Sequence, residues 1–273
     1  MIRFAEQRDF PAVVDLWNCC FPGDETFTAW FFAHSYRPEV TLVDEEDGVL
    51  CSMLQMLPYQ LHDMRGVRPV TYIYGACTAP ACRRQHRMDR LLARSFELDR
   101  QAGRAASVLI PQEEWLFDFY DQFGYQTAFY TDSTIVSRAD TPVEADGQMR
   151  RLTEADIPAL RALCPSDGLC LLRTDADWQA QLALFDALGY GVYGWESAGH
   201  LTAYAFVWQD GPDKLWAQEI CGAHVRQLAQ SLLRKSGTRQ IRLTGAGMTQ
   251  KLGCIRYHDD TPVETGYFNL LFN

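Results

Sequence analysis

The first half of the sequence, taken as residues 1–138, contains no lysine, and its 13 arginines face 19 aspartates and glutamates. The difference between these counts gives this half a net charge of −6, and the net charge of the whole chain is −10. Proteins that bind nucleic acid present a basic surface, so this balance argues against a nucleic-acid partner. No stretch approaches the length of a membrane span, and the polar run Met1–Asp9 stands where an export signal would have an apolar core. We therefore expect a cytoplasmic protein with neither nucleic acid nor membrane as partner.

Residue pairs with metal-binding spacing are also missing. The nine cysteines form no Cys-x-x-Cys motif and have no nearby histidine partner, and Cys19 and Cys20 are adjacent, which makes a bridge between them difficult. Five histidines show no metal-like spacing either: His34, His62, His200, His224 and His258. An odd number of scattered cysteines in a chain of this length indicates reduced thiols, with neither disulfides nor zinc. We expect no metal ion.

The chain is long enough for two packed domains, with 273 residues, 47% of them hydrophobic and 12% aromatic. A polar linker with proline and glycine at 140–147 predicts a first domain at 1–138 and a second at 148–273. The start of the second domain, Arg151–Pro158, is similar to Arg3–Pro11 with one residue deleted, which indicates a tandem repeat. The alternative is that any strand followed by a capped helix would look alike.

Hydrophobic periodicity and breaker residues predict the elements of both halves. In the first half we expect strands at 2–4, 39–43, 49–58, 70–74, 105–110 and 125–136, and helices at 9–20, 25–34, 88–103 and 113–123. In the second half we expect helices at 177–188 and 225–235, and strands at 190–195, 201–208, 214–220, 238–243 and 266–272. The order in the first half is β-α-α-β-β-β-α-β-α-β.

The segment that follows the strand Val70–Tyr74 is basic. Pro80 ends the strand because proline lacks the N–H that a β-ladder requires. Seven of the 13 arginines of the first half fall between residues 83 and 104, where a helix begins. Free N–H groups and the positive dipole end at such a helix start favour an anion, most often phosphate. The alternative is that these arginines are solvated or paired with Glu97 and Asp99.

Two motifs resemble those of a known family, the GNAT N-acetyltransferases. The acyl-CoA loop of that family, Arg/Gln–x–x–Gly–x–Gly/Ala, is similar to the stretch Thr78–x–Pro80–x–x–Arg83–Arg84–Gln85–His86–Arg87–Met88. Its Phe–Tyr–x–x–x–Gly–Phe motif is similar to Phe119–Tyr120–x–x–x–Gly124–Tyr125. With the two-half layout, the chain resembles the Eis-like subgroup. The resemblance implies tandem GNAT folds of the α/β class with a mixed sheet, and acetyl transfer from acetyl-CoA to a primary amine by direct attack in a ternary complex.

The resemblance also implies a cofactor site for acetyl-CoA. Its residues would be Ala76, Cys77, Thr78, Arg83, Arg84, Gln85, His86, Arg87, Met88 and Asp89. The first three would pair with pantetheine through their backbone, and the N–H groups of 84–89 would hold the pyrophosphate, with charge-assisted contacts from Arg83, Arg84 and Arg87. His86 departs from the family pattern because it replaces a glycine, and its Cβ can force a positive φ or crowd a phosphate.

Tyr120 is the catalytic candidate that the second motif implies. When an amine attacks the thioester, the collapsing intermediate expels a thiolate, which a nearby phenol can protonate. The alternative is a half-buried aromatic residue on a helix, and we expect Tyr125 to be core. For the general base, Glu113 and Glu114 begin the helix that borders the thioester in this fold. Acidic residues are equally expected in a first helical turn, so the base stays open.

The second half lacks both motifs. After its strand 214–220 comes Cys221–Gly–Ala–His–Val, with no proline and no run of arginines, so we expect a GNAT-like domain without its own CoA site. The substrate would be a small-molecule or peptide amine. The excess of carboxylates and three aromatic residues suggest a cationic, partly apolar one: Trp30, Phe31 and Phe32. The alternative is that these aromatic residues belong to the core. The alternative function is a catalytically inactive acyl-CoA-binding or ligand-sensing module. The identity of the amine and a homo-oligomer stay open.

Overall fold

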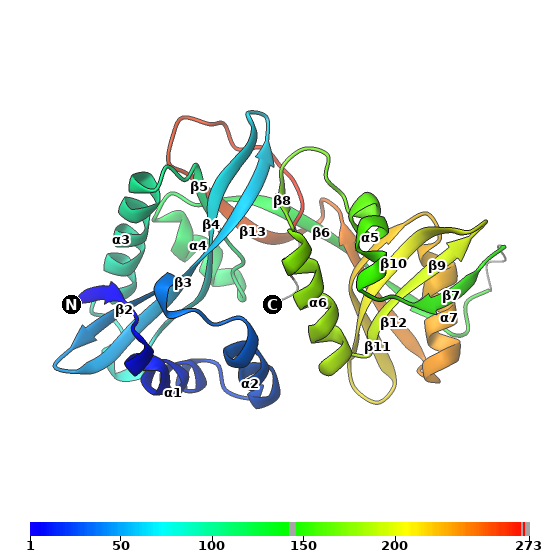
Figure 1. Ribbon diagram of the computed structural model, residues 1–273, viewed down its shortest axis with the longest axis horizontal. Coiled ribbons are helices and arrows are strands. Elements are labelled where there is room, and N and C mark those ends of the chain that lie inside the picture. The colour runs from blue at the N-terminus through cyan, green and yellow to red at the C-terminus, as the bar shows by residue number, and fades with distance from the viewer. Residues whose placement is uncertain (142–145, 269, 271–273) are drawn as a thin grey trace. The chain divides into compact units, whose positions relative to one another are not determined.

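The computed structural model describes residues 1–141, 146–268 and 270. It consists of two compact units (Figure 1): unit 1 is Met1–Ala128 with Leu252–Glu264, and unit 2 is Phe129–Lys251 with Thr265–Asn273. In each unit, α-helices pack on both faces of a mixed β-sheet, which confirms the predicted α/β class with a mixed sheet. Over the described residues, every helix is too short or too polar to cross a bilayer.

Unit 1 holds the first part of the chain and one strand from near its end. Its helices are α1 (Phe10–Cys20), α2 (Glu25–His34), α3 (Arg87–Gln101) and α4 (Glu114–Asp121). Its strands are β1 (Ile2–Phe4), β2 (Thr41–Glu46), β3 (Val49–Asp63), β4 (Gly66–Thr78), β5 (Ala106–Leu109) and β13 (Gln250–Tyr257). They lie in the order β1-β2-β3-β4-β5-β13, antiparallel except for the parallel pair β4 and β5.

Two helix pairs cover the two faces of this sheet. Successive side chains of a strand point to opposite faces, so Ile73 and Tyr74 of β4 enter different layers. Ile73 belongs to a buried cluster with Phe96 of α3 and with residues of α4. The Tyr74 ring lies 5.6 Å from that of Trp17 in α1 and 5.2 Å from that of Phe31 in α2. The sheet of unit 1 is therefore enclosed by α3 and α4 on one face and α1 and α2 on the other.

Gly75 lets α1 approach β4 at the point where the regular strand pairing breaks. Its φ is +59°, and a Cβ at this position would lie 2.4 Å from Cζ3 of Trp17. The register between β3 and β4 shifts here, so β4 carries a bulge. Glycine fits here because it adopts the left-handed backbone without strain and has no Cβ to collide with the Trp17 indole.

Unit 2 has the same kind of architecture. Its helices are α5 (Ile157–Leu163), α6 (Asp175–Ala187) and α7 (Val225–Ser236). Its strands are β6 (Gln126–Ser137), β7 (Gln148–Arg151), β8 (Cys170–Leu172), β9 (Gly191–Ser197), β10 (His200–Gln209), β11 (Lys214–Gly222) and β12 (Gln240–Ala246). Six of these pair in the order β6-β12-β11-β10-β9-β7, with β11 and β12 parallel.

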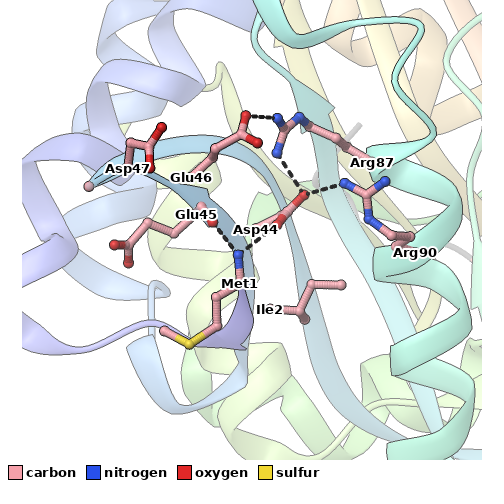
Figure 2. A pocket seen from close by; sticks show the side chains of 9 residues that line it. Met1, Ile2, Asp44, Glu45, Glu46, Asp47, Arg87 and Arg90 are labelled. Carbon is pink, nitrogen blue, oxygen red and sulfur yellow. Dashed lines mark hydrogen bonds and ion pairs between the residues drawn. The ribbon is translucent and has the colours of Figure 1, made fainter.

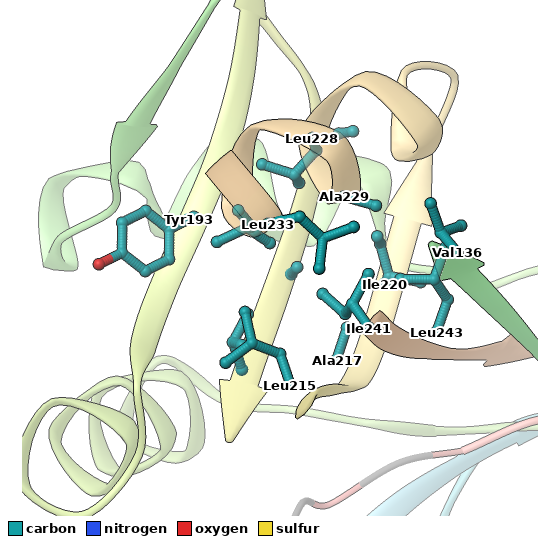
Figure 3. Packing of buried hydrophobic residues seen from close by; sticks show 14 of the residues in the cluster. Val136, Tyr193, Leu215, Ala217, Ile220, Leu228, Ala229, Leu233, Ile241 and Leu243 are labelled. Atoms are coloured by element: carbon teal, nitrogen blue, oxygen red, sulfur yellow. The ribbon is translucent and has the colours of Figure 1, made fainter. Parts of the chain in front are cut away.

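Successive side chains along the strands of unit 2 also point to opposite faces of the sheet, so each face has its own core layer. Figure 3 shows α7 placing Leu228, Ala229 and Leu233 against the aliphatic residues of β11 and β12, such as Leu215 and Ile241. The opposite face carries the aromatic residues of β10 and α6, in which Phe185 packs on Phe206 with ring centroids 5.1 Å apart.

The tandem repeat is visible as a matching ion-pair corner at the start of each unit. In unit 1, Arg3 donates through Nη2 to Asp9 at 2.9 Å, and in unit 2, Arg150 donates through Nη2 to Asp156 at 2.7 Å. Each arginine also donates through Nε to a glutamate, Glu45 in unit 1 and Glu196 in unit 2. The repeat therefore begins at Arg150, and the predicted alignment on Arg151 with a deleted residue is wrong.

The two units divide the chain differently from the predicted domains 1–138 and 148–273. Strand β6, expected to close the first domain, pairs with β12 over Thr131–Ser137 and belongs to unit 2. Strand β13, which the sequence analysis missed, pairs with β5 in unit 1. Of the expected strand 266–272, Gly266 makes isolated bridges, and residues 269, 271 and 272 lie outside the described residues, as do residues 142–145 of the linker 140–147.

Candidate functional site

The loop between β4 and α3 has an unusual backbone. A 3₁₀ turn, η3 (Pro80–Cys82), follows β4, and α3 begins at Arg87. Arg84 has a φ of +62° and His86 a φ of +56°, the left-handed region that side chains with a Cβ rarely adopt. The sequence left open whether His86 takes a positive φ or crowds a phosphate, and its backbone has the positive φ; the left-handed Arg84 was not foreseen. Residues at such angles persist where the surrounding structure or a function requires them.

This backbone presents free donors at the start of a helix. Within the described part of the chain, none of the N–H groups of residues 84–89 donates to a backbone acceptor, because the first turn of a helix has none. Left-handed residues alternating with ordinary ones turn successive N–H groups toward one concavity, which is a geometry that binds anions. The positive end of the α3 dipole adds to this preference.

The predicted arginines divide into two exposed ones and one buried one. Arg83 is exposed and donates through Nε to the carbonyl oxygen of Thr78 at 3.2 Å, which ties the loop to the end of β4. Arg84 is exposed and forms no ion pair among the described residues. Arg87 is buried, and its guanidinium donates to Asp44 at 3.1 Å and to Glu46. Only the first two are therefore available to a bound anion.

Gln85, His86, Met88 and Asp89 complete the predicted loop. The Gln85 side chain accepts from Nε of Arg87 at 3.0 Å, and the His86 ring, which is 83% exposed, contacts Asp89 at 2.7 Å. Met88 packs partly buried against the core cluster under α3. These side-chain contacts hold the loop in place.

Beside the loop lies an open cleft of about 680 Å³ whose walls are charged (Figure 2). Buried Asp44 is its centre and accepts from Arg87 at 3.1 Å, from Arg90 at 3.1 Å and from the Met1 amine at 3.3 Å. Burial works to raise the pKa of Asp44, but these hydrogen bonds outweigh it and hold the pKa below its usual value. Further carboxylates line the cleft: Glu45, Glu46 and Asp47. This acidic surround makes the cleft a poor phosphate site, unlike the loop.

The partners of Arg87 are residues that the sequence analysis missed. Asp44 and Glu46 lie at the end of β2, more than 40 residues before Arg87. A pattern of charges along the sequence gives no sign of a pair across two elements. One signal was available. The acidic residues end β2, the arginine run follows β4, and both strands pair with β3, which brings the two runs to the same end of the sheet.

The predicted pantetheine strand lies where β4 separates from β5. The parallel pairing runs from Val70 to Tyr72, and β5 ends at Leu109 while β4 continues to Thr78. Ala76, Cys77 and Thr78 therefore lie beyond the paired part of this edge. On the β3 side, Ser52 donates through its hydroxyl to the carbonyl oxygen of Cys77 at 2.8 Å. Ser52 thus fixes the β3 edge of this segment, whereas on the opposite edge the pairing with β5 stops at Tyr72.

Tyr120 lies under this segment in the core between β4 and α4. Its side chain is 8% exposed, and its ring packs edge-on against that of Tyr125 with centroids 5.7 Å apart. Burial, with smaller effects from neighbouring Cys254 and Cys77, raises the pKa of Tyr120 well above its usual value. The phenol is therefore protonated at neutral pH, as a proton donor must be. Tyr125 is core as expected, and its hydroxyl is bonded to Ser107.

The remaining candidates separate into exposed and buried groups. Glu113 accepts a hydrogen bond from the indole N–H of Trp115, which is 59% exposed at the start of α4. The three aromatic residues suggested for the amine site are buried instead: Trp30, Phe31 and Phe32. Aromatic residues on an amphipathic helix are usually core, and these pack against α1 and β4, so that suggestion was wrong. Across the described ranges, no cluster of three ligating side chains could hold a metal ion.

Comparison with known proteins is consistent with this geometry. Residues 1–128 match the family model described as an acetyltransferase (GNAT) domain. No curated protein sequence matches the chain. Among solved structures, a GCN5-related N-acetyltransferase from Anabaena variabilis ATCC 29413 is similar, with a TM-score of 0.73 at 14% identity over 94% of this chain and 72% of that chain.

Two further structures share the fold of the whole chain. Eis1 from Mycobacterium abscessus has a TM-score of 0.70 at 14% identity, over 95% of this chain and 74% of that one. A tandem GNAT protein from the clavulanic acid biosynthesis pathway has a TM-score of 0.59 at 13% identity, over 96% of this chain and 100% of that one. At such identities the likeness shows the fold, which is the predicted tandem GNAT architecture of Eis-like proteins.

Proposed function

Because residues 1–128 of this chain are a GNAT acetyltransferase domain in a tandem GNAT fold, we propose that it transfers an acetyl group from acetyl-CoA to a primary amine. The observation that carries this proposal is the loop of residues 84–89, with its left-handed Arg84 and His86 and its free N–H groups. Phosphate binds to such a helix start, and exposed Arg83 and Arg84 lie beside it.

Acetyl-CoA fits the rest of this edge as well. The unpaired side of Ala76 to Thr78 offers main-chain groups to the two amides of a pantetheine arm. An arm that entered at the loop and followed β4 would bring its thioester toward the bulge at Gly75, and Tyr120 lies close to Cys77 in this region. The amine nitrogen attacks the thioester carbonyl, the tetrahedral intermediate collapses, and the Tyr120 phenol gives its proton to the departing thiolate.

Unit 2 supports this role without a cofactor site of its own. Strand β11 ends at Gly222 and α7 begins at Val225, so only Ala223 and His224 connect them. The Ala223 N–H already donates to the carbonyl oxygen of Thr202 at 2.9 Å, and His224 is not left-handed. Unit 1 has eight residues at the corresponding place, from Ala79 to His86. We therefore assign no CoA site to the described residues of unit 2.

We expect Arg84→Glu to weaken acetyl-CoA binding roughly 10- to 100-fold in isothermal titration calorimetry. The substitution removes an exposed guanidinium that forms no ion pair among the described residues, and it adds repulsion. Hydrogen bonds to charged groups contribute ~1.5–3 kcal/mol. Arg87 is left unchanged in this test, because it is buried and paired with Asp44 and Glu46.

The matched control is Arg94→Glu, which makes the same charge change on the exposed face of α3, where Arg94 pairs only with Glu97 at 2.9 Å. Equal losses in both variants would indicate a long-range charge effect and would remove the loop assignment. CoA release with a panel of amines tests the activity itself. Binding without turnover by any amine would favour the inactive acyl-CoA-binding module.

We expect His86→Gly to keep or improve the affinity for acetyl-CoA. Glycine adopts a φ of +56° without strain and allows a closer approach of the phosphate, whereas a left-handed residue with a Cβ costs roughly 1–2 kcal/mol. Calorimetry measures the affinity, and urea unfolding shows whether the relieved strain raises stability. A large loss of affinity would show that the imidazole itself contacts the cofactor.

A further inference from the structure

Cys20 lies at the C-terminal end of α1, directly against the loop stem. Trp17, one helical turn earlier, packs on Gly75, so the same face of α1 continues over the end of β4. The Cys20 thiol donates to the carbonyl oxygen of Thr78 at 3.5 Å, and Arg83 donates through Nε to the same oxygen at 3.2 Å. A thiol and a guanidinium therefore converge on one atom.

A second thiol completes this arrangement. Cys77 is buried in β4 and directly precedes Thr78, whose carbonyl oxygen the Cys20 thiol contacts at 3.5 Å, so the two cysteines are close neighbours. The contact with Cys77, together with the charge of Arg83, lowers the pKa of Cys20 to about 7, although partial burial opposes the shift. Burial, with the Cys20 contact, raises the pKa of Cys77 well above its usual value. Near neutral pH the Cys20 thiol therefore exchanges readily with its thiolate, while Cys77 stays protonated, which is how an attacking and a resolving cysteine differ.

We propose that Cys20 is a site of oxidation by hydroperoxides and that Cys77 resolves it to a disulfide between α1 and β4. In the first step, the Cys20 thiolate attacks the distal peroxide oxygen, the O–O bond breaks, and Cys20 becomes a sulfenic acid while hydroxide, or alkoxide from an organic peroxide, leaves. In the second step, the Cys77 sulfur attacks the Cys20 sulfur, the S–O bond breaks, and water leaves with the Cys77 proton. Two thiols are oxidised and one peroxide is reduced.

The other cysteines nearby are less suited to begin this chemistry. Cys51 and Cys82 also interact, but burial, with the Cys82 contact, raises the pKa of Cys51 to about 11, so little thiolate forms. Cys19 is exposed but adjacent to Cys20, and a disulfide between neighbours in a helix is strained. The thiol chemistry of Cys20 and Cys77 is independent of the proposed acetyl transfer, although it fixes the segment assigned to pantetheine.

The test counts thiols after a limited dose of hydrogen peroxide. The reduced full chain is treated, quenched with catalase, unfolded, and labelled with a maleimide of high mass that shifts the band on a gel once per free thiol. We expect the wild type to lose two of its nine thiols and to regain them with dithiothreitol. Cys20→Ser should keep all its remaining thiols. Cys77→Ser, treated in the presence of dimedone, should carry one dimedone adduct on Cys20, located by peptide mass spectrometry.

Two matched variants separate this pair from its neighbours. Cys19→Ser and Cys82→Ser should each still lose two thiols, because both leave Cys20 and Cys77 in place. A wild type that keeps every thiol, a Cys20→Ser variant that still loses two, or a Cys77→Ser variant with no adduct on Cys20 would each overturn the proposal. Loss of acetyl-CoA binding or of turnover has no bearing on these readouts.

Discussion

Tyr120→Phe is expected to lower kcat by about 10²–10⁴-fold while the KM for acetyl-CoA changes little. The phenolic proton matters only as negative charge builds on the thiolate sulfur, so its loss removes an interaction made mainly in the transition state. The ring remains, and with it the packing against Tyr125 and Phe119. Steady-state kinetics with an amine found in the panel measures both constants.

The matched control is Tyr125→Phe. Its hydroxyl bonds to Ser107 in the core, so we expect a loss of about 1 kcal/mol in the free energy of unfolding and near-normal kcat. The reverse result, with Tyr120→Phe active and Tyr125→Phe inactive, would place the motif in the wrong register. If neither variant lost activity, a water or another side chain would protonate the thiolate.

The pH profile offers a second check on Tyr120. Burial raises its pKa, so the phenol stays protonated through and beyond the usual tyrosine range near ~10. Activity limited by this donor should therefore not fall as the pH rises to about 10. A basic limb near neutral pH in kcat, present in the wild type and absent in Tyr120→Phe, would contradict the assignment.

Local sequence patterns predicted the positions of helices and strands better than they predicted which elements pack or pair with each other. The helix at 25–34 was placed at its observed bounds, Glu25–His34, because Asp24 caps it and an aromatic stripe runs along it. The same aromatic residues were used to suggest a cationic, partly apolar amine, yet Phe31 is buried, since periodicity marks an apolar face without saying what covers it. This apolar face of α2 packs into the core against α1 and β4.

Long-range pairing was the part that the sequence left open. Strand β13 lies far along the chain from its partner β5, and no local signal links Cys254 to Leu109. Similarly, the arginine run identified the loop, but it could not show that Arg87 turns inward to Asp44 while Arg84 stays exposed. The spacing of a motif predicts how the backbone runs around a ligand. The direction of each side chain depends on the helices and strands that pack beside that residue.

Glu219→Ala is expected to destabilise unit 2 by about 3–5 kcal/mol, the usual cost of leaving one partner of a buried ion pair uncompensated. Glu219 of β11 is fully buried and receives both Nη groups of Arg173, at 2.8 and 2.5 Å. Two tyrosine hydroxyls also donate to it, Tyr204 at 2.8 Å and Tyr267 at 3.1 Å. Removing the carboxylate leaves the buried Arg173 guanidinium without its counter-charge.

Hydrogen exchange by mass spectrometry is the suitable measurement, because a protein with two units does not unfold in a single step. Peptides of α6 and β11 should lose protection in Glu219→Ala, while peptides of α3 and β3 in unit 1 keep theirs. Asp186→Ala is the control, since Asp186 pairs with Arg151 at 2.7 Å in a half-exposed bridge, and such bridges contribute ~0–1 kcal/mol.

The double variant Arg173→Met, Glu219→Met identifies the cause. If the stranded charge is responsible, removing both charges at similar volume should recover most of the lost protection, because apolar replacements of buried pairs are often neutral. If the double variant is as unprotected as Glu219→Ala, the loss comes from the tyrosine hydrogen bonds and from packing. In that case the ion pair is not what stabilises this core, and the expected gain from charge removal is refuted.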